Sequence, residues 1–442
     1  MSFRILFLAL FPLFGSAGQA QKLSGGIEGI AVARGIVRLD VARGGGHVPL
    51  DSVRVGPSGT FHFNTVLPGA GFYQLVVNDT DRVDLILDPR ETEVMLEFTG
   101  TPLQRHIRVV RSEENQRLWE YKVLSKETQA ISASVAQQRA GLAPTDQAGA
   151  LALDSVLSRA MRSKRSYLAS VMREAPEGFF ARAIRADQAL DTMQGKNPLA
   201  VAEVFDFSDA ALMRSAVYDR AVMVFLQNLN AVSEGQFVVA SDTLMGRAAK
   251  VQATSAYMLE HLLDLFTTYG PEMAAAHLVD RYIATGQGTG AFSPELQAKV
   301  AAYLEVSIGA EGPDIVLTDA SGALPLSLRI DGAPRTVLFF YSSTCDHCHA
   351  EMPGLKAIHS AYAAAGLKIF GIALDTDSAE FEHCIRENAL PWPGFSEFNG
   401  WGSSMAKAYH VRATPSFFLL DEHRIILAKP VDAADLANKL QE

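Results

Sequence analysis

Cysteine, charge and long apolar runs are all scarce in this chain, and each scarcity excludes a class of protein. Three cysteines in 442 residues are too few to cross-link a secreted scaffold that depends on disulfides for its stability. Beyond the first 20 residues, no segment reaches about 18 consecutive apolar residues, so we expect no membrane-spanning helix. Charged residues make up 20% and apolar residues 48%, a composition that predicts folded domains rather than disorder.

An excess of positive charge is absent as well. The 39 Lys and Arg residues are outnumbered by 49 Asp and Glu residues, which gives a formal charge of −10 and a pI near 5.6. A protein that holds nucleic acid through its phosphates needs the opposite sign, so we expect no nucleic-acid partner. We interpret the one cationic cluster as the solvated face of a helix; it consists of Arg159, Arg162, Lys164 and Arg165.

The first 20 residues are predicted to be a cleaved secretory signal. A short cationic start, an apolar stretch from Ile5 to Phe14 and a small-residue segment ending at Ala20 follow the order of such signals. The apolar stretch is too short for a bilayer that takes about 20 residues to cross. The first cysteine is Cys345, so we expect no lipid anchor at the cleavage point. The mature protein is therefore expected to be soluble and periplasmic, or otherwise extracytoplasmic.

Hydrophobic periodicity divides the remaining chain into three predicted parts. Residues 21–101 alternate with period two between turns, which predicts an antiparallel β-sandwich with no residue suited to catalysis. Residues 102–307 carry apolar residues at spacings of three and four, which predicts an α-helical domain. Residues 308–442 alternate strands with helices, and the run from Thr336 to Tyr341 is apolar enough to be a strand buried on both faces. The candidate strands of the first part are Gly35 to Val41, Val48 to Val55, Thr60 to Asn64, Phe72 to Val77, Arg82 to Leu87 and Glu93 to Phe98.

A pair of cysteines lies where this apolar strand meets the following predicted helix. Cys345 and Cys348 are three residues apart, so they share a helix face and lie close enough to form a disulfide. A helix N-terminus favours the thiolate of Cys345; a protonated His347 would favour it too, whereas Asp346 would oppose it. We expect Cys345 to attack a substrate disulfide and Cys348 to resolve the mixed disulfide that results.

Three other chemistries fit parts of the same segment. Cys345 to His349 matches the C-x-x-C-H pattern of haem c attachment. A haem c site does not require a buried strand before the motif, so it would leave the apolar strand here unexplained. Zinc could bind the two thiolates with His349 or Cys384, but no second close pair completes the site. A peroxidatic P-x-x-x-T/S-x-x-C pattern is matched by Ser342 but has Leu338 in place of Pro. We therefore expect no metal and no cofactor, and we interpret Cys384 as a buried, unpaired thiol.

The segment Cys345 to Pro353 resembles the C-x-x-C-x-x-E-x-P stretch of the TlpA/ResA-like branch of the thioredoxin family, and Tyr409 to Ser416 is similar to its Y-x-V-x-x-T-P segment. The resemblance implies a thioredoxin-like fold over residues 308–442. It also implies a cis Pro415 facing the dithiol, and a Thr414 backbone that pairs with an extended substrate.

The same resemblance implies that Glu351 assists proton transfer to and from the thiols, whereas the residue pattern alone would fit a solvated glutamate. Two positions depart from the family. Thr344 stands where a Trp commonly precedes the first cysteine, and His347 next to the second cysteine is the arrangement of the oxidant DsbA. The family resemblance thus favours a reductase, while His347 favours a more oxidising potential.

Weaker resemblances extend upstream. Leu50 to Val53 with Gly59 to Phe63 is similar to a β-rich domain of unknown function in exported bacterial proteins, and Phe205 to Asp209 is similar to a helical domain, also of unknown function, that follows it. The sequence thus predicts an exported thiol:disulfide oxidoreductase, a reductase, that acts on protein disulfides or dithiols and draws on a membrane electron donor. The alternatives are a binding or scaffold protein with a thioredoxin-like docking domain, and a peroxiredoxin-like peroxidase.

Overall fold

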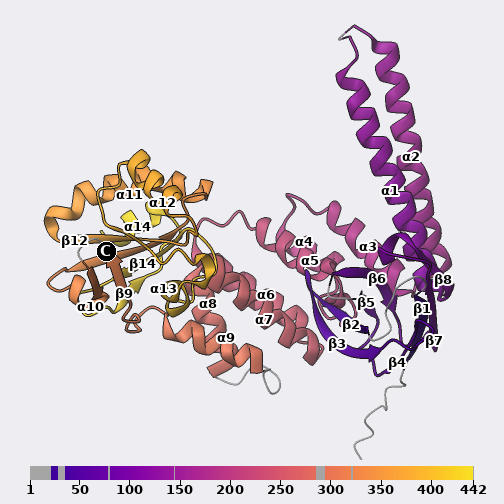
Figure 1. The fold of residues 1–442 in the computed structure, drawn as a ribbon, viewed down its shortest axis with the longest axis horizontal. Helices are drawn as coiled ribbons and strands as arrows, with labels where there is room; N and C mark the ends of the chain where they lie inside the picture. Colours follow the sequence, from indigo (N-terminus) through magenta and orange to yellow (C-terminus); the bar gives the residue numbers. More distant parts are fainter. Residues whose placement is uncertain are drawn as a thin grey trace, which may run out of the picture. The chain divides into compact units, whose positions relative to one another are not determined.

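The computed structural model describes residues 21–27, 35–77, 80–143, 145–284, 294–319 and 322–441. The predicted signal, residues 1–20, lies outside the described residues. The chain divides into two compact units, Met1–Leu229 and Asn230–Glu442, and Figure 1 shows the elements of each. Within the described residues, no helix is both long and apolar enough to cross a membrane.

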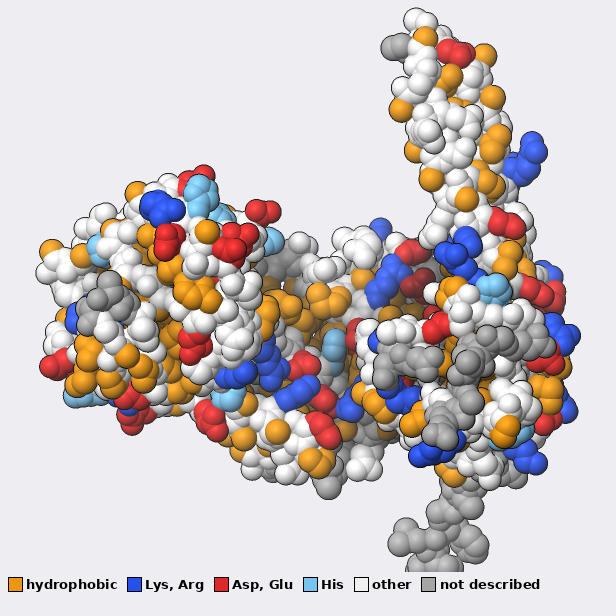
Figure 2. Space-filling view, in the orientation of Figure 1, with side chains coloured by type: hydrophobic (Ala, Val, Ile, Leu, Met, Phe, Trp, Pro, Cys, Tyr) orange, Lys and Arg blue, Asp and Glu red, His pale blue; other side chains and the backbone are white. Residues whose placement is uncertain are grey.

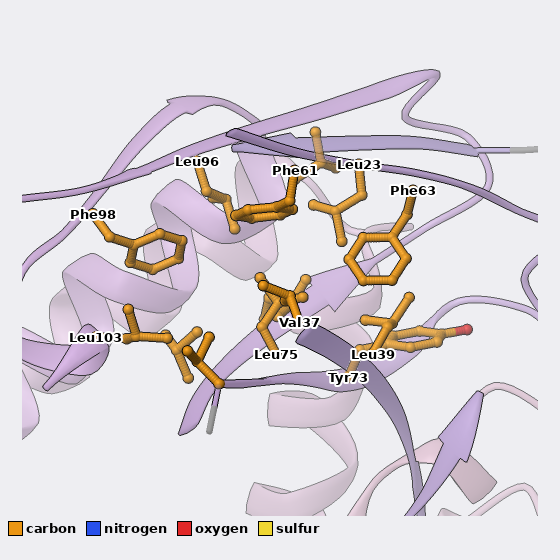
Figure 3. Packing of buried hydrophobic residues seen from close by; sticks show 14 of the residues in the cluster. Leu23, Val37, Leu39, Phe61, Phe63, Tyr73, Leu75, Leu96, Phe98 and Leu103 are labelled. Carbon is orange, nitrogen blue, oxygen red and sulfur yellow. The ribbon is translucent and has the colours of Figure 1, made fainter. Parts of the chain in front are cut away.

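The first unit begins with two four-stranded sheets that share one core. The strand orders are β4-β1-β7-β8 and β3-β2-β5-β6. Apolar side chains alternate along each strand, so one face of each sheet contributes to the core (Figure 3), where Phe61 and Leu96 of one sheet lie across from Val37 and Leu75 of the other. The strands are β1 (Gln21–Ile27), β2 (Ile36–Arg43), β3 (Gly46–Arg54), β4 (Thr60–Thr65), β5 (Gly71–Val77), β6 (Asp81–Leu87), β7 (Glu93–Phe98) and β8 (Ile107–Arg111).

Two features of these sheets differ from the sequence prediction. The sheets are not wholly antiparallel, because β1 pairs in parallel with β7 while it pairs antiparallel with β4. The β region also extends past residue 101, since β8 pairs with β7 and completes the first sheet. The pairing of β1 with β7 joins residues far apart in sequence, and neither pairing is revealed by periodicity along one strand.

Helices complete the first unit. A long hairpin consists of α1 (Glu113–Ala140) and α2 (Gln147–Glu174), and it is followed by α3 (Phe179–Asp191), α4 (Pro198–Val204) and α5 (Ala216–Gln227). The base of α1 is fixed to β6 because the buried Asn115 side chain bonds both the N–H and the C=O of Ile86. Apolar side chains lie among polar ones over the surface of the hairpin (Figure 2). Arg159, Arg162 and Arg165 are exposed on α2, as predicted, whereas Lys164 of the same cluster is partly buried and lies over the ring of Tyr121.

The second unit joins four helices to the C-terminal α/β domain. The helices are α6 (Glu234–Ala248), α7 (Gln252–Tyr269), α8 (Glu272–Leu278), which continues into a π-helical turn, and α9 (Pro294–Glu305). The predicted helical domain, residues 102–307, is therefore divided between the two units at residues 229 and 230. The predicted boundary at residue 307 also falls inside a core, since Val306 packs with Leu338 and Phe340 of the α/β domain.

The C-terminal domain is built on a five-stranded sheet of order β13-β12-β11-β14-β15. The central strand β11 (Arg335–Tyr341) pairs in parallel with β12 (Leu367–Ala373) and antiparallel with β14 (Ser416–Leu420). Its alternate residues belong to two different cores, Phe340 on one face and Phe339 on the other. The predicted strand buried on both faces is thus confirmed, since every residue from Thr336 to Tyr341 is buried.

Helices and short strands cover the two faces of this sheet. The helices α11 (Asp346–Tyr362), α12 (Ser378–Asn388) and α14 (Ala433–Lys439) pack on the face that holds Phe339. The short strands β9 (Val316–Asp319) and β10 (Gly322–Pro325) pair antiparallel, and the chain turns into a helix, α10, directly after Pro325. The remaining elements are α10 (Leu326–Arg329), β13 (Gly394–Ser396), α13 (Ser404–Ala408) and β15 (Ile426–Ala428).

Candidate active site

The two neighbouring cysteines lie at the carboxyl end of β11, where the chain enters α11. Cys345 is the N-cap residue of α11, and its Sγ accepts a 3.4 Å hydrogen bond from the backbone N–H of Cys348. Cys345 is partly exposed, whereas Cys348 is fully buried in the core beneath it. All three cysteines of the chain are free thiols. The strand-to-helix turn therefore presents one thiol outward and holds the other behind it.

The pKa values of the two thiols are shifted in opposite directions. Burial raises the pKa of Cys345, but hydrogen bonds from the thiol and the N–H of Cys348 outweigh burial, so its pKa is lowered from the usual 9.0. Burial raises the pKa of the Cys348 thiol, and its hydrogen bond to Cys345 raises it further. Cys345 is thus the group that ionises first, and Cys348 keeps its proton until a partner removes it.

The loop between Cys345 and β11 is held from behind by a buried carboxylate. Asp375, 4% exposed, follows β12 and accepts three hydrogen bonds. They come from the Ser342 hydroxyl at 3.0 Å, the Ser343 N–H at 2.8 Å and the Ser343 hydroxyl at 2.6 Å. A buried carboxylate needs several donors to offset its desolvation, and this loop supplies them. Asp375 therefore fixes the backbone that leads into Cys345.

His349, directly after Cys348, fixes the same loop from the other side. Its Nε2 lies 2.7 Å from the carbonyl oxygen of Ser343; because a carbonyl can only accept, Nε2 carries the proton. Its Nδ1 accepts a longer, 3.5 Å bond from the side-chain amide of Asn388 on α12. Both ring nitrogens are engaged within the fold, and His349 therefore positions the loop rather than facing a ligand.

The predicted substrate-facing segment does meet the dithiol. The Cys345 thiol lies 3.7 Å from the carbonyl oxygen of Thr414. The Thr414–Pro415 peptide bond is cis, which confirms the expectation for Pro415. The segment is brought there by the sheet, since Ser416 at the start of β14 pairs with Phe340 near the end of β11.

The other predicted site residues lie around this centre, and the backbone of His347 hydrogen-bonds to the Cys345 thiol. Asp346 and His347 are exposed in the first turn of α11. Glu351 is partly buried, and its Oε2 accepts a 2.7 Å bond from the N–H of Ala433 at the start of α14. His347 and Glu351 line a cleft of about 470 Å³ together with Thr414 and Pro415.

Cys384 is 2% exposed on α12, as predicted for a buried unpaired thiol. Burial raises its pKa, and hydrogen bonds from Ser343 and Asn388 oppose that effect only in part. The described residues hold no group of three or more His, Cys, Asp and Glu side chains arranged for a metal ion.

Sequence reasoning missed Asp375, and it considered His349 only as a metal or haem ligand. A signal for Asp375 was present, because it follows a buried strand that runs parallel to β11 and so lies at the same sheet edge as Cys345. Nothing in the sequence indicated that the carboxylate would turn inward to bind Ser342 and Ser343.

A family model matches the C-terminal region of the chain. Residues 308–429 match the model of the AhpC/TSA family. The thiol-disulfide oxidoreductase ResA of a Bacillus cereus strain is 28% identical over 127 residues, which cover 28% of this chain and 70% of that protein. The sporulation thiol-disulfide oxidoreductase A of Bacillus subtilis (strain 168) is 28% identical over 91 residues, 20% of this chain and 53% of that protein.

Solved structures resemble parts of the chain. A thiol-disulfide oxidoreductase from Bacteroides fragilis NCTC 9343 is 27% identical, covers 30% of this chain and 97% of its own, and has a TM-score of 0.27. A thioredoxin-like protein from Bacteroides caccae ATCC 43185 is 19% identical, covers 55% of this chain and 91% of its own, and has a TM-score of 0.40. On the family match and the resemblance to ResA, the C-terminal region of this chain is a thioredoxin-like domain of the AhpC/TSA family.

Proposed function

We propose that this protein is an exported thiol:disulfide oxidoreductase whose Cys345/Cys348 pair reduces disulfides in partner proteins. The observation that carries the proposal is the contrast between the two thiols. Cys345 is partly exposed with a lowered pKa, and Cys348 is buried with a raised one. Both properties suit a nucleophile that attacks from the surface and a resolving thiol that acts from behind it.

The exchange runs in two balanced steps. The Cys345 thiolate attacks one sulfur of the substrate disulfide; a Cys345–substrate disulfide forms, and the other substrate sulfur leaves as a thiolate that takes up a proton. Cys348 then loses its proton and attacks the Cys345 sulfur, which closes the Cys345–Cys348 disulfide and releases the second substrate thiol. The protein gives up two electrons, and a dithiol donor at the membrane restores its reduced form.

Export rests on the signal-like character of residues 1–20. A reductase is favoured over an oxidant by the resemblance to ResA, while the exposed His347 beside Cys348 favours the opposite direction. The equilibrium potential of the Cys345/Cys348 pair decides between them. A value near that of thioredoxin, about −270 mV, would support the reductase, and a value between about −180 and −120 mV would show an oxidant or isomerase.

The variant Cys345→Ser tests whether thiol chemistry is the function at all. It should abolish the reduction of protein disulfides by dithiothreitol through this protein. If cells that carry the variant behave like cells with the wild type, the domain serves as a docking surface and the enzyme proposal is wrong.

A peroxidase is the second candidate, because Ser342 and Cys345 match part of the peroxidatic pattern. Against it stands Leu338, in the position where the peroxidatic pattern has Pro. Consumption of hydrogen peroxide with dithiothreitol as reductant separates the two. Turnover of peroxide at a rate above that of protein disulfides would replace the reductase proposal.

A further inference from the structure

We propose that helices α7 and α9 form the second wall of the substrate cleft, and that this cleft binds an extended polypeptide with a large apolar side chain next to its cysteine. The inference rests on the proposed function, because it names the substrate class for the same dithiol. It also gives a role to helices that the sequence pattern placed in a separate domain.

The cleft of about 470 Å³ has two different walls. One wall belongs to the thioredoxin-like domain and holds Thr414, Pro415, His347 and Glu351, next to the thiol of Cys345. The other wall belongs to the helices and includes Phe266, Thr267, Thr268, Tyr269, Lys299 and Tyr303. The volume falls within the range of about 300–1,000 Å³ that suits one or two side chains or a small ligand, not a folded domain.

An ion pair and a hydrogen bond fasten the helices to the loop that holds Pro415. Asp264 on α7 binds Arg412 at 2.8 Å, and Glu305 at the end of α9 lies 2.8 Å from Nε2 of His410. Both loop residues lie within five positions of Pro415. The substrate-facing loop is therefore attached to the helices through residues that precede Pro415.

An ion pair and a close contact hold the far end of the cleft. Glu272 on α8 binds Lys429 at 2.9 Å, and both side chains are largely buried. At Gly270, which joins α7 to α8 with φ +71°, an added Cβ would lie 2.9 Å from Cγ1 of Val431. Only glycine allows the helix end to approach this closely. Val431 is two residues from Ala433, whose N–H binds Glu351, so the wall reaches the turn that Glu351 holds.

The side chains that line the cleft favour an apolar side chain of the substrate. Its cations are already neutralised, since Arg412, Lys429 and Lys299 each bind a carboxylate. Lys429 also lies over the rings of Tyr303 and Phe418. At the mouth, Tyr269 is 69% exposed and Val431 is 52% exposed. An apolar side chain of the substrate would cover both residues, whereas an acidic one would find its partners occupied.

The test uses the mature chain and three synthetic peptides that carry one disulfide and differ only in the residue next to cysteine: Phe, Gly or Glu. The kcat/KM for reduction of each is measured with dithiothreitol as the electron donor, and glutathione disulfide reports the dithiol chemistry alone. We expect the Phe peptide to be preferred over the Gly peptide by at least about tenfold. Tyr269→Ala should bring this ratio close to one, and Tyr269→Phe should restore it.

The matched control is Val239→Ala on α6, a residue that is 67% exposed and outside the cleft, which should keep the wild-type ratio. Equal rates for Phe and Gly, a preference for Glu, or a ratio that survives Tyr269→Ala would each overturn the inference while leaving the oxidoreductase in place. A wild-type protein that reduces neither the peptides nor glutathione disulfide would overturn the proposed function and this inference with it.

Discussion

At the scale of single residues, the site depends on two thiols, three positions apart, that differ in exposure and in pKa. The same strand-to-helix turn exposes Cys345 to hydrogen-bond donors and buries Cys348. Asp375 and His349 hold the preceding loop, so the position of Cys345 depends on side chains that never touch a substrate.

The pKa of Cys345 is below 9.0, and this predicts how its alkylation depends on pH. Because only the thiolate reacts, the rate with iodoacetamide should rise with pH and level off below pH 9. The Cys348 thiol, with its raised pKa, should stay unmodified over that range. Mass spectrometry of the reduced protein measures both. In Cys348→Ala the levelling should move to higher pH, since the donor thiol is lost; an unchanged profile would contradict the assigned cause.

Asp375→Asn should destabilise the second unit by about 1–3 kcal/mol. The amide nitrogen donates rather than accepts, so it leaves a buried hydroxyl or N–H of Ser342 or Ser343 without its acceptor. Denaturation with urea measures the loss. Asp377→Asn is the matched control, because Asp377 caps α12 and asparagine caps as well as aspartate. Equal losses in the two variants would remove the special role of Asp375.

At the scale of elements, the sequence predicted the strands and helices whose apolar residues recur at regular spacing. The apolar run of β11 and the helix that begins at the cysteines were both predictable, because burial on two faces and helical spacing leave local patterns. The parallel pairing of β1 with β7 was not, since it joins residues about 70 positions apart. Nor could spacing show that α7 and α9 line the cleft beside Pro415.

Glu351 links two elements, and two variants separate its possible roles. Glu351→Gln keeps an oxygen for the N–H of Ala433 but cannot transfer a proton, so a relay predicts that disulfide exchange slows by about 10²-fold with unchanged stability. Glu351→Ala should slow exchange and also lose about 1 kcal/mol of stability at the start of α14. Stopped-flow exchange and urea denaturation give the two readouts. Full activity in Glu351→Gln would leave only the structural role.

At the scale of the whole molecule, residues 230–442 form one compact unit that includes both the helices α6 to α9 and the C-terminal α/β domain. A fragment of residues 308–442 lacks Val306, which is 3% exposed in the core that includes Leu338 and Phe340. We expect this fragment to be less stable than residues 230–442 by about 1.5–3 kcal/mol, the value of one buried apolar side chain. Their urea midpoints test this, and equal midpoints would show that the helices only lie against the domain.

The two ion pairs that hold the cleft wall, Arg412–Asp264 and Lys429–Glu272, differ in their exposure to solvent. The carboxylate of Asp264 has an exposed fraction of 45%, whereas that of Glu272 has only 10%. Because salt screens exposed pairs more than buried ones, a rise from low to high ionic strength should weaken the pair at Arg412 while the pair at Lys429 persists. Substrate selectivity in this protein would then follow the salinity of its surroundings, and a discrimination between Phe and Gly peptides that does not change from 10 mM to 1 M salt, about 30 Å to 3 Å of screening length, would show otherwise.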